Sequence, residues 1–144
     1  MPEEWIEIAA DWQNGLAFVG QDSTGATLQM GTLDGKPGFS PMHLLLVALA
    51  SCTGEDIVSI LQKKRLALSG MQVRVRAKRA SDYPKIWTDI HLTYLVWGED
   101  IHSKDVEQAI QLSEDKYCSV GLMLGKVARI SSEYHLLKPG ESAE

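Results

Sequence analysis

The chain is poor in cysteine: Cys52 and Cys118 are the only two among its 144 residues. No basic start followed by an apolar segment marks a secretory leader, so we expect a cytoplasmic location. In a reducing compartment a thiol pair is more often catalytic or free than structural. The longest apolar run is about ten residues, short of the roughly 20 that span a bilayer, which predicts no membrane association.

Other absences narrow the function further. The net charge of −5 argues against nucleic acid as the main partner. The four histidines show no ligand spacing with one another or with the cysteines, so we expect no metal site. The sequence also lacks a glycine-rich phosphate loop and a serine-centred elbow, and we expect no bound cofactor. The length suits a single domain, which we place at residues 1–138, with a disordered tail at 139–144.

Hydrophobic periodicity predicts an α+β domain. Alternating apolar and polar residues indicate six strands, at residues 6–12, 16–19, 26–31, 71–78, 86–97 and 128–136. Helical spacing indicates a long helix at 41–64, a second helix from Ser103 to residue 117, and a short helical turn that ends at residue 124. The predicted order is therefore βββ-α-ββ-αα-β.

Two local signals refine these elements. Asn14-Gly15 predicts a two-residue hairpin turn, because both positions tolerate positive φ. In the fifth strand, alternation places Ile86 on the same face as Ile90 and Trp87 on the opposite face.

The long predicted helix is apolar on nearly every side of its first half. Ser40 suits the N-cap position and Pro41 the first helical position. A helix that is apolar all round must be covered all round. Six short strands and two modest helices cannot easily provide that cover within one subunit, so we expect an intimate homodimer.

The residues around the two thiols leave their role open. Cys52 lies mid-helix, where Glu55 and Asp56 would raise its pKa if they share its face. Cys118 follows Lys116 at the predicted start of a short helix, whose free N–H groups favour negative charge. From the residues alone, either cysteine fits a packed core position as well as a reactive site.

Four strings of the sequence, in this order along the chain, resemble the OsmC/Ohr family, and within it the YhfA-like branch. They are Ser40-Pro41-Met42-His43-Leu44-Leu45-Leu46, Ala50-Ser51-Cys52-Thr53, Val58-Ser59-Ile60-Leu61 and Lys116-Tyr117-Cys118-Ser119-Val120. With the element order, the resemblance covers nearly the whole chain. It implies an intertwined homodimer with two long buried helices at its centre and two sites at the subunit interface.

The resemblance also implies an activity. In the peroxidase members of the family, the cysteine of the central helix reduces an organic hydroperoxide, as part of oxidative and osmotic stress defence. Carried over to this chain, Cys52 is the peroxidatic cysteine and Cys118 the resolving one, and they form a disulfide. An external dithiol such as dihydrolipoamide then reduces it. This cycle uses ordinary cysteine oxidation chemistry.

The chain departs from the family pattern at two positions. The peroxidases hold the thiolate with an arginine from the N-terminal region, but this chain has no arginine before Arg65, and Lys36 is the one cation ahead of the helix. His43 stands where the family commonly has a glutamate. We therefore add Lys36, His43 and Glu55 as further site candidates. The alternative function is a non-enzymatic dimer that binds a small hydrophobic ligand at the subunit interface.

Overall fold

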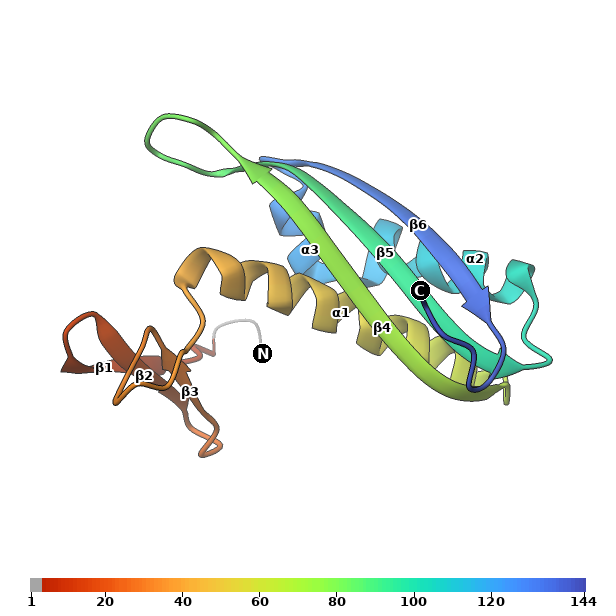
Figure 1. The fold of residues 1–144 in the computed structure, drawn as a ribbon, viewed down its shortest axis with the longest axis horizontal. Coiled ribbons are helices and arrows are strands. Elements are labelled where there is room, and N and C mark those ends of the chain that lie inside the picture. The colour runs from red at the N-terminus through yellow and green to blue at the C-terminus, as the bar shows by residue number, and fades with distance from the viewer. Residues whose placement is uncertain (1–3) are drawn as a thin grey trace. The chain divides into compact units, whose positions relative to one another are not determined.

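The structure is a computed structural model that describes residues 4–144, and it confirms the α+β class (Figure 1). The chain forms two compact units, Met1–Leu45 and Leu46–Glu144. Their boundary falls within the long helix α1 (Pro41–Lys63). The assignment of residues 1–138 to one domain and the disorder of 139–144 stay predictions.

The N-terminal unit contains an antiparallel sheet of three strands in the order β1-β2-β3. Its strands are β1 (Ile8–Asn14), β2 (Ala17–Asp22) and β3 (Thr27–Met30). The first hairpin turn lies at residues 15–16, one residue later than predicted, with Gly15 at a φ of 56°. This left-handed conformation is the reason that the turn uses glycine.

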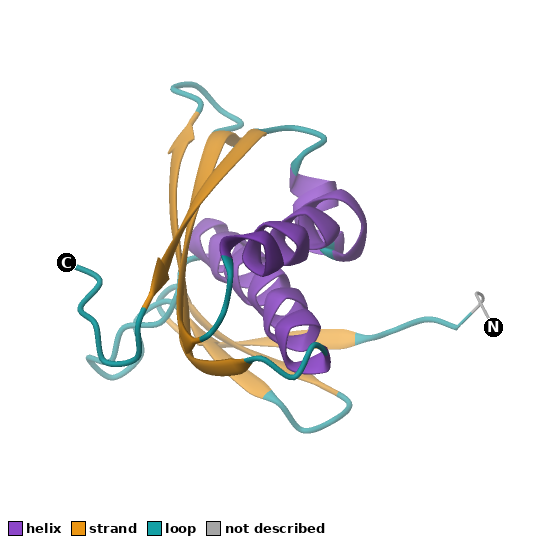
Figure 2. Ribbon diagram, turned by 90° about the vertical axis from the view of Figure 1, so that its right-hand side faces the viewer, coloured by secondary structure: helices purple, strands orange, loops and turns teal. Residues whose placement is uncertain are grey.

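The sheet of the C-terminal unit has the order β4-β5-β6. It consists of β4 (Ala67–Arg79), β5 (Trp87–Glu99) and β6 (Arg129–Leu137). The β4–β5 pair is antiparallel and the β5–β6 pair is parallel. Parallel neighbours need a long crossover connection. Helical segments supply that connection here, and the helices of this unit cover one face of the sheet (Figure 2).

The crossover differs from the single helix predicted up to residue 117. The α-helix α2 (Ser103–Leu112) ends early, and the chain continues as a π-helix, η1 (Ser113–Tyr117), before α3 (Ser119–Leu124). The residue that caps α2 is His102 rather than Ser103, and its N–H donates to Oδ2 of Asp105 at 3.3 Å. A π-turn carries one extra residue per turn, which apolar spacing alone does not reveal.

The predicted facing of Ile86 and Trp87 is wrong. Trp87 is 6% exposed and belongs to the core, whereas Ile86 is 41% exposed. The register between β4 and β5 shifts there, because Lys78 pairs with Asp89 but the next residue, Arg79, pairs with Trp87. Such a bulge reverses the alternation of side chains beyond it, and it turns Trp87 inward.

The helix α1 buries only one stripe within this chain. Leu49, Thr53, Ile57 and Leu61, spaced by four residues, are almost fully buried, while Val47 is 40% exposed. By length and composition alone α1 could also cross a membrane, a test that the core helix of a soluble protein passes too. The described chain therefore leaves much of a strongly apolar helix uncovered.

Candidate functional site

The helix α1 holds Cys52 beside its buried stripe. Ser40 Oγ accepts a hydrogen bond of 3.3 Å from the N–H of His43, as expected of an N-cap. Cys52 is half-buried and lies directly before the buried Thr53. The Thr53 hydroxyl donates to the carbonyl of Leu49 at 3.2 Å, so its polar atom is satisfied inside the core. Cys52 is thus a rigidly held and partly accessible thiol.

The π-helix η1 delivers Cys118 to the site. The Cys118 N–H donates to the carbonyl of Ser113 at 2.8 Å, which closes the π-turn. Cys118 is then the N-cap of α3, and its Sγ accepts from the N–H of Gly121 at 3.2 Å. The expectation that Cys118 sits at the start of a short helix is confirmed. Unlike Cys52, the side chain is fully buried.

Gly121 allows α3 to approach the thiol closely. A Cβ atom at this position would lie 3.2 Å from Cys118 Sγ and 3.3 Å from Cδ1 of Leu49. Both separations are tighter than nine in ten real Cβ contacts. A side chain at residue 121 would therefore require the sulfur atom and the Leu49 side chain to shift by a few tenths of an ångström.

The structure brings the two thiols together. The Cys52 side chain lies close enough to Cys118 to affect the pKa of its thiol. Burial, chiefly, and then the interaction with the Cys52 side chain raise the pKa of the Cys118 thiol to about 12, and the negative charges of Cys52 and Asp56 add to the rise. The N–H of Gly121 acts in the opposite direction. Cys118 therefore keeps its proton at neutral pH, and its thiol can donate a hydrogen bond to a group beside it.

Four polar residues that sequence reasoning did not assign to the site surround this pair. Tyr94 is fully buried on β5, and its hydroxyl donates to Glu114 Oε2 at 2.8 Å. Burial, followed by the Glu114 carboxylate, raises the pKa of Tyr94. Ser113, also fully buried, donates to Asp56 Oδ2 at 2.9 Å. Of the four, only Asp56 could have been predicted from the sequence, because it lies four residues after Cys52 on the same helix.

The remaining predicted candidates are placed as follows. Lys36 and His43 belong to the N-terminal unit, and their roles stay predictions. Glu55 is exposed and accepts a hydrogen bond of 3.1 Å from the hydroxyl of Ser51. Within residues 4–144, no group of three or more potential ligands forms a metal site.

A cleft of about 630 Å³ opens beside Cys118. Its walls combine apolar residues from α1, β5, α3 and β6 with a few charged ones. The residues that line it include Leu49, Leu92, Leu122, Ile130, Glu114 and Lys126. Mostly apolar clefts with a few polar groups are typical of small-molecule sites.

These features define a class of protein: a small α+β domain that places a half-buried thiol against a fully buried one. The family model of OsmC-like proteins matches residues 33–133, and the chain belongs to this family. Protein YhfA of Escherichia coli K12 is 36% identical over 132 residues, which cover 92% of this chain and 98% of YhfA.

Solved structures agree with this assignment. A hypothetical protein from Aquifex aeolicus is 33% identical, with a TM-score of 0.79, over 92% of this chain and 98% of that one. The organic hydroperoxide resistance protein OhrB of Bacillus subtilis has a TM-score of 0.60 over 92% of this chain and 98% of its own. At 13% identity, OhrB shares the fold.

Proposed function

We propose that this protein is a thiol peroxidase that reduces organic hydroperoxides through a cycle of Cys52 and Cys118. The observation that carries the proposal is the contact between the two thiols. One is accessible enough to meet a substrate, and the other is buried and holds its proton at neutral pH. This division suits a nucleophile and its resolving partner.

The first step of the proposed cycle takes place at Cys52. Its thiolate attacks the terminal oxygen of the hydroperoxide, the O–O bond breaks, and the alkoxide leaves and takes up a proton as an alcohol. Cys52 is thereby oxidised to a sulfenic acid. The protonated Cys118 lies beside Cys52 during this step.

The second step joins the two sulfur atoms. The Cys118 sulfur attacks the sulfenic sulfur, and the hydroxyl group of the sulfenic acid leaves with the Cys118 proton as water. An external dithiol then reduces the disulfide and is itself oxidised, so the protein needs no bound cofactor. Cys118 follows the end of η1, and it is the thiol that moves, because Cys52 lies within a continuous helix.

Family membership supports the proposal, since OhrB, which shares the fold, is named for organic hydroperoxide resistance. Lys36, the only lysine or arginine that precedes α1 in the sequence, is our candidate for the cation that stabilises the thiolate. His43, in the first turn of α1, and Glu55 remain secondary candidates. We also propose a homodimer, because α1 leaves apolar surface uncovered. From the sequence we further propose that it is cytoplasmic and acts without nucleic acid or membrane.

The second candidate function is the binding of a small hydrophobic ligand without catalysis. The cleft beside Cys118 favours it, because its walls are mainly apolar. The lack of any arginine before Arg65 also favours it. The two functions differ in whether the thiols are repeatedly oxidised by hydroperoxide and reduced again.

The test is consumption of cumene hydroperoxide by the purified protein with dithiothreitol present. We expect turnover by the wild type and none by Cys52→Ser. Cys118→Ser should complete one oxidation of Cys52 and then stall, whereas Lys36→Ala should slow the first step. A wild-type protein whose two thiols survive excess hydroperoxide would exclude the peroxidase and leave the ligand-binding function.

A further inference from the structure

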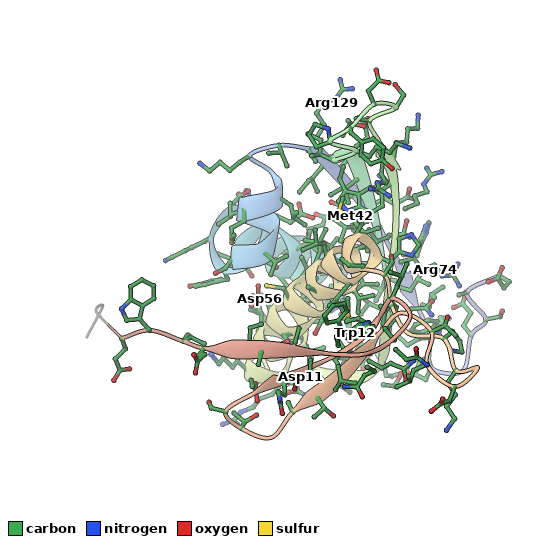
Figure 3. All side chains as sticks on the ribbon, turned by 90° about the vertical axis from the view of Figure 1, so that its left-hand side faces the viewer. Asp11, Trp12, Met42, Asp56, Arg74 and Arg129 are labelled. Atoms are coloured by element: carbon green, nitrogen blue, oxygen red, sulfur yellow. The ribbon has the colours of Figure 1, made fainter. Side chains whose placement is uncertain are left out.

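A partly buried hydrogen bond links α1 to η1, the segment that carries Cys118 to the site. Ser113, the first residue of η1, is fully buried, and its Oγ donates to Oδ2 of Asp56 at 2.9 Å. Asp56 lies on the side of α1 that faces the later helices (Figure 3). A buried hydroxyl bound to a carboxylate makes a stronger hydrogen bond than two neutral groups do.

This bond completes a closed ring of contacts that contains both thiols. Asp56 lies one helical turn after Cys52, so the two side chains share a face of α1. Ser113 binds Asp56 through its hydroxyl, and its carbonyl accepts from the N–H of Cys118 at 2.8 Å. The ring closes through the interaction between the side chains of Cys118 and Cys52.

We propose that Asp56 and Ser113 are a positioning pair that sets the approach of Cys118 to Cys52 for disulfide formation. Disulfides form only within a narrow range of distances and angles, so a small displacement of η1 costs bond formation heavily. The inference rests on the proposed function for its peroxide step. Positioning itself is a property of the reduced thiol pair, and it can be measured without peroxide.

Asp56 has a second effect that must be separated from positioning. Its negative charge contributes to the raised pKa of Cys118 and so opposes ionisation of the resolving thiol. Asp56→Asn keeps an oxygen that accepts from Ser113 but removes the charge. Asp56→Ala removes both. Comparison of the two variants therefore distinguishes the hydrogen bond from the charge.

The main test is equilibration of the protein with reduced and oxidised glutathione. Oxidised glutathione accepts two electrons and two protons from the thiol pair and yields two molecules of glutathione and the protein disulfide. The equilibrium gives the effective concentration of one thiol toward the other. We expect Ser113→Ala and Asp56→Ala to lower this effective concentration about tenfold, because each removes the hydrogen bond to the buried Ser113 hydroxyl. Asp56→Asn, which keeps a neutral acceptor, should lower it less than Asp56→Ala does.

The matched control is Ser119→Ala, an exposed serine directly after Cys118. It should leave the effective concentration unchanged. Thermal unfolding of each reduced variant checks that it folds, and if Ser113→Ala does not, the contrast between Asp56→Ala and Asp56→Asn decides. Equal effective concentrations in the wild type and every folded variant would overturn the positioning pair.

A second readout links positioning to the proposed cycle. With excess cumene hydroperoxide, slower resolution in Ser113→Ala should divert Cys52 to sulfinic acid, seen as a gain of two oxygen atoms in its peptide. In one outcome, Cys52 of the wild type stays unoxidised by the peroxide while Ser113→Ala still lowers the effective concentration measured with glutathione. That result would refute the peroxidase function and support the positioning pair. If the peroxide oxidises Cys52 but Ser113→Ala forms the disulfide as fast as the wild type, the positioning pair is refuted and the peroxidase function is not.

Discussion

The hydroxyl of Tyr94 donates a hydrogen bond of 2.8 Å to Oε2 of Glu114, and it ties β5 to the π-helix that precedes Cys118. Together with the bond between Ser113 and Asp56, it fixes η1 to the sheet on one side and to α1 on the other. The segment that carries the buried thiol is thus held at two consecutive residues.

Tyr94→Phe should destabilise the reduced protein by about 1–3 kcal/mol, because it leaves the Glu114 carboxylate without its buried donor. Urea unfolding measures the loss. Tyr83→Phe is the control, since Tyr83 is 85% exposed and its change should stay within about 0.5 kcal/mol. Equal effects of the two variants would show that the Tyr94 hydroxyl contributes no stability.

Two glycines in helices should respond to alanine with opposite signs. Gly121→Ala places a methyl group 3.2 Å from Cys118 Sγ and should cost about 1–3 kcal/mol of overpacking. At Gly54, on α1, a Cβ meets only Cγ2 of Val73 at an ordinary 3.5 Å. Gly54→Ala should therefore stabilise the protein by about 0.5–1 kcal/mol through helix propensity. Urea midpoints of both variants give the signs, and a stabilising Gly121→Ala would contradict the close approach of α3.

The buried thiol predicts how stability depends on pH. The pKa of Cys118 rises from 9.0 to about 12 on folding, mainly through burial. Its contribution to stability is fully present below about pH 9, and it is lost as the pH rises toward 12, because the unfolded chain releases the proton first. Unfolding of the reduced protein between pH 8 and about pH 10 should show this decline. Cys118→Ala should decline less steeply, and parallel profiles would refute the raised pKa.

Much of the fold was predictable because it follows local periodicity. The alternation in β4 and the cap at Ser40 both depend on neighbours in the sequence, and both predictions are confirmed. The inward turn of Trp87 was not predictable, because a bulge in the pairing with β4 decides it. The π-turn of η1 was not predictable either, because the spacing of apolar residues in the sequence does not reveal it.

The candidate site likewise contains residues that the sequence predicted and residues that it did not. The two cysteines were predicted as site residues from the sequence strings around them. Their proximity could not be deduced from their spacing in the sequence. Tyr94 and Glu114 come from different elements and meet only through the crossover that connects β5 to β6. No local pattern marks a tyrosine in a strand as the partner of a glutamate in a later helix.

The uncovered surface of α1 gives the last prediction. Val47 is 40% exposed within this chain, although the helix around it is strongly apolar. If a second copy covers this surface, Val47→Asp buries an unpaired charge at the interface and should weaken the dimer by several kcal/mol. Light scattering at micromolar concentration should then show a dimer for the wild type and monomer or insoluble protein for the variant. Gln111→Asp adds the same charge at an exposed position of α2 and should remain dimeric. A wild-type protein that is a well-folded monomer under these conditions would show that α1 needs no partner.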